Sequence, residues 1–209
     1  LALRAVLSTY AGVLRMRPAM GAAMAMAVSF GVLATFLSSA QPIFGEVYGL
    51  GWGLPAVFGA MTAFFVIAAI VNARLVVRLG APRMARIGLT SWAVSGTAGL
   101  IVFALAFEGV PPLWLLLVWL SPTLSMFAIL YGNLLATALA PLGDRAGSAS
   151  SALAASGTLA GVALGALTSG IFNGTVLPLA GMLGFAGVAG LAAMRWGGLG
   201  RESHGKGEA

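Results

Sequence analysis

The chain has 209 residues, of which 60% are hydrophobic and 8% are charged, and its formal net charge at pH 7 is +6. Since a soluble domain typically has about 25% charged residues, this composition excludes a water-soluble globular protein and indicates a protein dissolved in a lipid bilayer. The basic residues do not form a cluster with aromatic residues, so we expect no nucleic-acid partner. There is no cysteine, and the single histidine, His204, lies in the C-terminal tail, so we expect no metal site and no cofactor.

Charged residues divide the chain into long uncharged segments, which are 18–45, 47–73, 87–107, 109–143 and 146–194. Because a membrane-spanning helix needs roughly 20 residues, the first four segments each hold one span and the last holds two, divided at Asn173-Gly174. The predicted transmembrane helices are 19–40, 54–77, 87–107, 113–138, 148–171 and 176–196. The sequence begins with Leu1, so we expect part of a longer chain, with residues 1–18 as a cytoplasmic linker and 197–209 as a disordered cytoplasmic tail.

The lysines and arginines predict the orientation of these helices, since the cytoplasmic flanks of membrane helices retain positive charge. With six crossings, all basic residues lie on one side of the membrane, and Glu46 and Glu108 lie on the other. We therefore expect both termini in the cytoplasm. The basic residues are Arg4, Arg15, Arg17, Arg74, Arg78, Arg83, Arg86, Arg145, Arg195, Arg201 and Lys206.

Polar and aromatic side chains on three predicted helices are candidates for substrate contact. They are Phe30, Ser38 and Gln41 in the first helix, Met61 and Phe65 in the second, and Phe127, Tyr131 and Asn133 in the fourth. Residues three or four apart share a helix face, so several of these side chains lie together on one face. Packing against lipid or another helix is the competing explanation, and a buried polar side chain then needs a partner there. The sequence leaves both explanations open.

A basic turn follows the second predicted helix. Asn72, Arg74, Arg78 and Arg83 surround the break at Gly80-Ala81-Pro82. One interpretation is a short cytoplasmic loop that only fixes the topology. The other is a tight hinge whose guanidinium groups hold neighbouring helix ends together and gate the protein.

Glycines recur at a spacing of four in the fifth predicted helix. Gly157, Gly161 and Gly165 give one face almost without side chains. Small residues allow helix backbones to approach closely in membranes, so we expect these glycines to mediate helix packing. A surface that slides along a partner helix during transport is the alternative.

Three segments carry a resemblance to a known family. They are Ser39-Ala40-Gln41-Pro42-Ile43-Phe44, Asn72-Ala73-Arg74-Leu75 with its basic turn, and Gly132-Asn133 leading into Ala146-Gly147-Ser148-Ala149-Ser150. Together they resemble the major facilitator superfamily, and within it the Bcr/CflA-type multidrug efflux transporters. The resemblance covers nearly all of the chain as the C-terminal six-helix half of a twelve-helix protein. It implies an all-α membrane fold, one half-bundle of two inverted three-helix units, whose partner is the N-terminal six-helix half.

The resemblance also implies a function. It implies a transporter in the bacterial inner membrane that exports small amphipathic compounds by alternating access, driven by the proton gradient. None of the five acidic residues lies within a predicted span, so proton-binding residues are expected in the N-terminal half. The alternatives are a transporter of the same fold for a specific metabolite, a non-catalytic six-helix membrane protein, and a homodimeric half-transporter. We expect no enzymatic activity, because His204 lies beyond the last span and an intramembrane serine protease needs a base beside its nucleophile.

Overall fold

The computed structural model describes residues 16–199, except the side chains of residues 144, 145, 148, 152 and 169. Within this range the chain forms helices and turns and contains no strand. Six helices are long and apolar enough to cross a membrane, so the chain has the all-α, multi-pass architecture that its composition predicts. The predicted N-terminal linker and C-terminal tail lie almost entirely outside the described residues.

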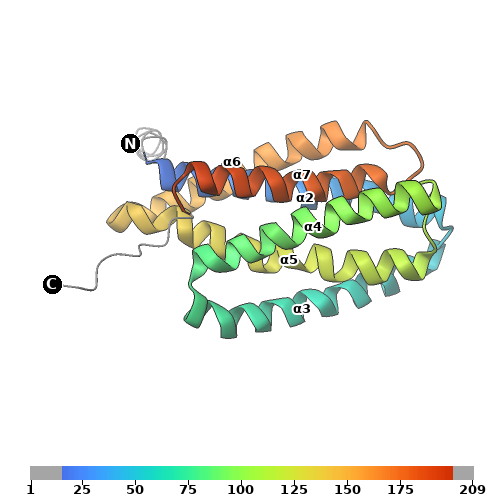
Figure 1. Ribbon diagram of the computed structural model, residues 1–209, viewed down its shortest axis with the longest axis horizontal. Coiled ribbons are helices and arrows are strands. Elements are labelled where there is room, and N and C mark those ends of the chain that lie inside the picture. The colour runs from blue at the N-terminus through green and yellow to red at the C-terminus, as the bar shows by residue number, and fades with distance from the viewer. Residues whose placement is uncertain (1–15, 200–209) are drawn as a thin grey trace.

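The six long helices are α2 (Arg17–Ala40), α3 (Leu54–Leu79), α4 (Ala81–Phe107), α5 (Leu113–Leu139), α6 (Ala146–Ser169) and α7 (Leu177–Trp196). Shorter segments extend or join them: the π-helix η1 (Gln41–Val47) continues α2, the 3-10 helix η2 (Gly51–Gly53) precedes α3, and η3 (Ala140–Arg145) joins α5 to α6. Consecutive long helices run in opposite directions, so α2 begins at the same end of the bundle at which α7 ends (Figure 1).

Two predicted helix boundaries are wrong by several residues. The third span begins at Ala81, so Arg83 and Arg86 lie in the first turns of α4, and the first span continues through η1 to Val47. A charge does not end a membrane helix, because a long arginine side chain reaches the interface from the last turn. Pro82 stands at the start of α4, where its missing N–H is not needed. The α-helices of the other four spans differ from their predicted bounds by at most two residues at either end, and η2 and η3 lengthen the second and fourth spans to Gly51–Leu79 and Leu113–Gly143.

The π-helix that extends α2 contains a proline. Pro42 has no N–H to donate within a helix, and it stands at the second position of this π-helix. Directly after the π-helix, the Tyr48 hydroxyl donates a hydrogen bond to the carbonyl oxygen of Pro111 at 2.5 Å. Burial raises the pKa of this hydroxyl, which favours its protonated, donating form. The end of the first span is thereby tied to the connection between α4 and α5.

The long helices pack in a regular set of pairs. α2 packs against α5, α6 and α7, α5 packs also against α3 and α4, and α4 packs along α7. Exchanging the first three helices with the last three leaves this set unchanged: α2–α6 becomes α5–α3, α2–α7 becomes α5–α4, and α2–α5 and α4–α7 map onto themselves. α3 and α6, which exchange with each other, lie at opposite edges of the bundle (Figure 1).

The edge helix α3 has only two buried residues, Met61 and Ala68. Its exposed large apolar residues are Phe64, Val66, Ile67, Ile70, Val71, Leu75 and Val77. Such a surface is costly in water, whereas lipid tails or an apolar protein surface cover it without penalty. The exposure of α3 therefore fits a helix inside a bilayer.

Glycines let α4 and α7 approach each other closely. A β-carbon added to Gly96 would lie 2.7 Å from the Cα of Gly184, and one added to Gly187 would lie 2.6 Å from the Cα of Ala93. Since lipid tails are as apolar as leucine, helices in a membrane associate through such close contacts and not through the hydrophobic effect. The α4–α7 contact thus joins the third and sixth spans of the bundle.

Candidate functional site

Three aromatic side chains meet where α2 packs against α5. The ring centroids of Phe30 and Phe127 are 5.6 Å apart and those of Phe30 and Tyr131 are 5.5 Å apart, both in edge-to-face geometry. Phe127 and Tyr131 lie one turn apart on α5, and their rings stack with centroids 6.1 Å apart. All three side chains are half-buried, so part of the ring surface stays accessible. We call these three residues the aromatic cluster.

The aromatic cluster also carries a hydrogen-bonding group. The Tyr131 hydroxyl has no hydrogen-bond partner in the part of the chain that the structure describes. A tyrosine hydroxyl in apolar surroundings usually finds a partner, so this one is free to bond to a ligand or to water. The ring faces offer apolar contact and attract cations. The cluster therefore presents the groups that an aromatic or amphipathic molecule would contact.

The three glycines of α6 lie against α2, beside Phe30 and Ala34. A β-carbon on Gly157 would lie 3.3 Å from Cδ2 of the Phe30 ring, and one on Gly161 would lie 2.7 Å from the carbonyl carbon of Phe30. One turn further on, a β-carbon on Gly165 would lie 2.5 Å from the Cβ of Ala34. The glycine face thus lets α6 pack directly on the α2 backbone, which fixes the position of Phe30.

Two polar candidates, Ser38 near the end of α2 and Gln41 at the start of η1, are exposed. The Ser38 hydroxyl donates to the carbonyl oxygen of Ala34 at 2.9 Å. The Gln41 side chain lies next to Gly45, one turn further along the chain. A β-carbon added to Gly45 would lie 2.9 Å from Nε2 of Gln41. Ser38 is two turns, about 12 Å along the helix axis, from Phe30. Both residues are accessible, but neither contacts the aromatic cluster.

The candidates on α3 do not reach the aromatic cluster. Met61 is 3% exposed and packs in the main core, so it is closed off from any ligand in this structure, and we remove it from the candidate contacts. Phe65 is half-buried against the same core. The ring contact between α3 and α2 is made by Phe58, whose centroid lies 5.7 Å from that of Phe36.

Asn133 is 3% exposed and has its partners within the protein. Its side-chain amide donates to Oδ1 of Asn72 and to the carbonyl oxygen of Ile129, both at 2.6 Å. The hydrogen bond to Asn72 joins α5 to α3. The partner of this buried amide is therefore a neighbouring helix and not a wet cavity, and we assign the pair to the scaffold.

The residues of the basic turn lie in helices and not in a loop. Asn72, Arg74 and Arg78 belong to α3, Arg83 belongs to α4, and Gly80 alone lies between the two helices. Gly80 has φ of 78°, a conformation that only glycine adopts without strain. The predicted loop is therefore corrected to a one-residue connection, and a hinge at this point is restricted to Gly80.

The described basic residues lie at one end of the bundle, which we call the arginine-bearing end, and Glu46 and Glu108 lie at the other. The basic residues are Arg17, Arg74, Arg78, Arg83, Arg86 and Arg195. The alternation of helix directions brings them together from four helices (Figure 1). Basic residues at one end only are typical of a membrane protein, because positive charge is retained on the cytoplasmic flanks of membrane helices.

Two tryptophans inside the bundle were not among the residues that the sequence singled out. Trp92 is fully buried, and its indole N–H donates to the carbonyl oxygen of Thr123 at 2.7 Å. Trp119 donates in the same way to the carbonyl oxygen of Ser95 at 3.0 Å. Both lie more than one turn inside the start of their predicted spans, and this was the available signal, because a tryptophan away from the interface needs an acceptor inside the protein.

The glycines of α7 were missed as well. Gly181, Gly184, Gly187 and Gly190 recur at a spacing of three, and the last three of them face α4. A spacing of three places residues near one another on a helix surface, as a spacing of four does. This pattern was readable in the sequence and marks the contact between α4 and α7.

Among the described residues, no group of three or more His, Cys, Asp or Glu side chains is placed to hold a metal ion. Comparisons of the chain with protein-family models, with curated proteins and with solved structures find no match. Its function must therefore be inferred from its own residues and their arrangement.

Proposed function

We propose that the chain is the C-terminal six-helix half of a secondary-active transporter of the major facilitator type, similar to the Bcr/CflA exporters. The observation that carries the proposal is the set of main helix contacts, which is unchanged when the first three helices are exchanged with the last three. Three is an odd number of crossings, so the second unit enters the membrane from the opposite side. Two such units form an inverted repeat, the arrangement nested in each half of major facilitator transporters.

The position of the aromatic cluster supports a substrate site. In transporters built from inverted repeats, the substrate binds where the repeats meet. α2 and α5 are the first helices of the two units, and Phe30, Phe127 and Tyr131 lie at their contact. Ser38 and Gln41 extend the accessible face of α2 away from the cluster. We propose these five residues as the substrate contacts of this half, with Phe65 at the flank.

The chemistry of the cluster favours small amphipathic cargo. Three ring faces and one free hydroxyl suit an aromatic compound, and a cationic group gains roughly 0.5–2 kcal/mol over such a ring face. A charged metabolite would instead need a fixed charge beside it. The cluster residues are uncharged, and among the described residues the six candidate spans contain one acidic side chain, Glu46, at the outer end of η1.

The rest of the mechanism belongs to the proposed partner half. Alternating access requires a second six-helix bundle, and the apolar edges along α3 and α6 are the surfaces available to it. Proton-binding acids are expected in that half, with the proton gradient as the energy source. The arginine-bearing end then faces the cytoplasm of a bacterium, and both termini lie on that side.

The test is drug resistance in a pump-deficient bacterial strain that expresses the natural reading frame containing these residues. We expect at least a fourfold higher inhibitory concentration for several amphipathic cations and dyes. Phe30→Ala and Tyr131→Ala should each abolish most of this gain while the protein level in the membrane stays unchanged. Phe185→Ala, which removes a ring exposed on α7, is the matched control and should keep the gain.

Two results would contradict the proposal. One is unchanged growth across a broad panel of compounds with the protein present in the membrane. The other is saturable transport of one metabolite that the cluster variants leave intact, which would favour a metabolite transporter with a different site.

A further inference from the structure

A basic groove lies at the arginine-bearing end, between the start of α2, the first turns of α4 and the end of α7. Its volume is about 800 Å³, and its lining includes Arg17, Arg86, Thr90, Arg195 and Trp196. Three arginines thus come together from three helices. None of the three makes an ion pair or hydrogen bond through its side chain in the part of the chain that the structure describes. Among the side chains described within residues 16–199, no acidic one compensates the positive charge of the groove.

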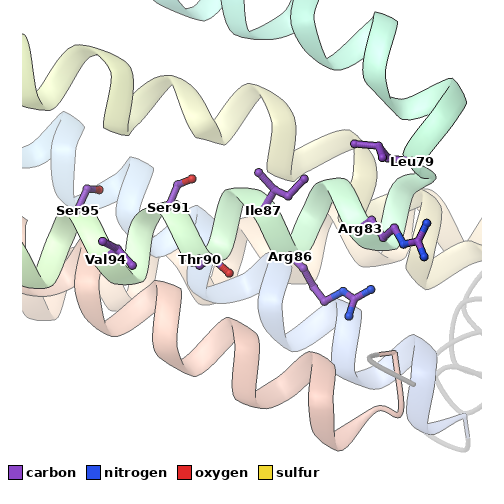
Figure 2. Close-up of a pocket in the computed structure, with 8 residues that line it drawn as sticks. All are labelled: Leu79, Arg83, Arg86, Ile87, Thr90, Ser91, Val94 and Ser95. Atoms are coloured by element: carbon purple, nitrogen blue, oxygen red, sulfur yellow. The ribbon is translucent and has the colours of Figure 1, made fainter. Parts of the chain in front are cut away.

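Close packing of the helix ends builds this groove. A β-carbon on Gly21 would lie 2.5 Å from the carbonyl oxygen of Ala193, and one on Gly197 would lie 2.9 Å from the carbonyl oxygen of Arg17. The backbones of α2 and α7 therefore touch at this end, which fixes Arg17 beside the last turn of α7. Arg86 extends from α4 toward the side on which α2 and α7 lie (Figure 2).

An apolar groove of about 850 Å³ continues from the basic one along α4, and Figure 2 shows the residues that line it. The two grooves share Arg86 and Thr90. Thr90 lies about 6 Å from Arg86 along the helix axis, and Val94 lies one turn deeper. Ile87 and Val94 are exposed and apolar. Positive charge at the end of the bundle thus leads into an apolar channel toward the middle of the membrane.

We propose that the two grooves form one binding site for an anionic phospholipid. Its phosphate lies among Arg17, Arg86 and Arg195, and an acyl chain follows Ile87 and Val94 along α4. Guanidinium groups bind phosphate oxygens through paired N–H donors, which suits three arginines that have no partner among the described residues. Basic pockets between transmembrane helices bind anionic lipid headgroups, so both the charge of this site and its position at the end of the bundle fit a lipid headgroup.

Two further residues fit a lipid better than a free anion. Thr90 places a hydroxyl about 6 Å inward of Arg86, at the depth of the ester groups of a lipid whose phosphate binds there. Trp196 is 55% exposed at the rim, and tryptophan prefers the headgroup level of a membrane.

The charge of the lining selects a lipid with a net negative charge. A zwitterionic headgroup brings an ammonium group, which needs an anion nearby, and the lining residues that the structure describes include no acid. The site shares no residue with the aromatic cluster, so its test does not depend on the proposed transport.

The experiment measures lipid binding to the purified chain in detergent by native mass spectrometry, with phosphatidylglycerol as the probe. R86Q/R195Q should weaken binding at least tenfold. The matched control R74Q/R78Q removes two positive charges from the same end outside both grooves and should change binding less than twofold. Equal losses in the two variants would overturn the site in favour of general attraction to charge.

The choice of lipid is tested by competition. Phosphatidylcholine should bind at least tenfold more weakly than phosphatidylglycerol, and millimolar inorganic phosphate should not displace the lipid. Equal binding of the two lipids would overturn the selection by charge. Displacement by phosphate would overturn the lipid as occupant in favour of a free anion.

A second pair of variants keeps the charges and fills the apolar groove. V94W should weaken phosphatidylglycerol binding at least fivefold, because the indole occupies the path of the acyl chain. V102W adds the same side chain at an exposed position of α4 outside the groove and should have no effect. If V94W binds the lipid as well as V102W does, the proposed chain path is wrong. The comparison of V94W with V102W tests the proposed lipid site even if R86Q/R195Q does not fold.

Discussion

Two asparagine side chains join α3 to α5 in apolar surroundings. The Asn133 amide donates to Asn72 at 2.6 Å, and α3 has few other buried contacts. Hydrogen bonds between membrane helices contribute about 0.6 kcal/mol on average and at most about 1.7 kcal/mol. We expect Asn72→Ala and Asn133→Ala to destabilise the bundle, with a coupling energy in this range in a double-mutant cycle. The measurement is unfolding by SDS in mixed micelles, and additive effects would show that the hydrogen bond contributes nothing.

The buried indole of Trp92 is a second internal link, between α4 and α5. Trp92→Phe leaves the Thr123 carbonyl without this donor and leaves a cavity, so we expect a loss of about 1–3 kcal/mol. Trp114→Phe changes a ring that is 66% exposed, and should stay within about 0.5 kcal/mol of the parent protein. Thermal unfolding in detergent measures both. Similar melting temperatures for the two variants would contradict the assigned contact.

The sequence predicts which residues share a helix face but not which face points inward. Spacing by four correctly places Phe127 and Tyr131 together on α5, where their rings stack. The same pattern places Met61 beside Phe65 on α3, yet Met61 is buried and closed to ligands. In a water-soluble protein the apolar face of a helix points to the core and the polar face points to water. In a membrane this difference is lost, because lipid and protein core are equally apolar. Neighbouring helices alone decide the rotation of α3, and they are not readable from its own residues.

At the scale of the elements, the contact between α4 and α7 depends on the absence of side chains. A β-carbon on Gly187 would lie 2.6 Å from the Cα of Ala93, where only backbone could yield. Gly187→Ala should therefore destabilise the protein by about 1–3 kcal/mol. Gly181→Ala lies on the same helix with no atom within 4 Å of the added carbon, and should be neutral or stabilising by up to about 1 kcal/mol. Melting temperatures in detergent compare the two, and an equal response would refute the close contact.

The number and direction of the spans follow from the sequence, whereas their ends do not. An uncharged segment of about 20 residues has to cross the membrane, so six crossings are fixed by length. Helix ends are set by local geometry: α4 begins at Ala81, directly after the positive φ of Gly80, and not after Arg86. The first span likewise continues past Ala40 into the π-helix Gln41–Val47, which contains Glu46, so the charge does not end it.

At the scale of the whole molecule, the two three-helix units predict two equivalent cross-links. The hydroxyl oxygens of Thr35 on α2 and Thr168 on α6 are 2.6 Å apart, and Asn72 and Asn133 make the corresponding link between α3 and α5. The chain has no cysteine, so cysteine pairs can be introduced without other changes. We expect T35C/T168C and N72C/N133C both to form disulfides on mild oxidation. The mismatched pairs T35C/N72C and T168C/N133C should stay reduced, and cross-linking of these would contradict the arrangement.

We propose that the end of the bundle that carries every described arginine faces the cytoplasm. The most direct test labels single-cysteine variants in intact bacteria with a membrane-impermeant maleimide. Trp52→Cys and Ile171→Cys lie at exposed positions at the end opposite the arginines, and should react in intact cells. Arg78→Cys and Arg195→Cys should react only after the membrane is opened. Labelling of Arg78→Cys in sealed cells, or different sidedness within either pair, would contradict the account.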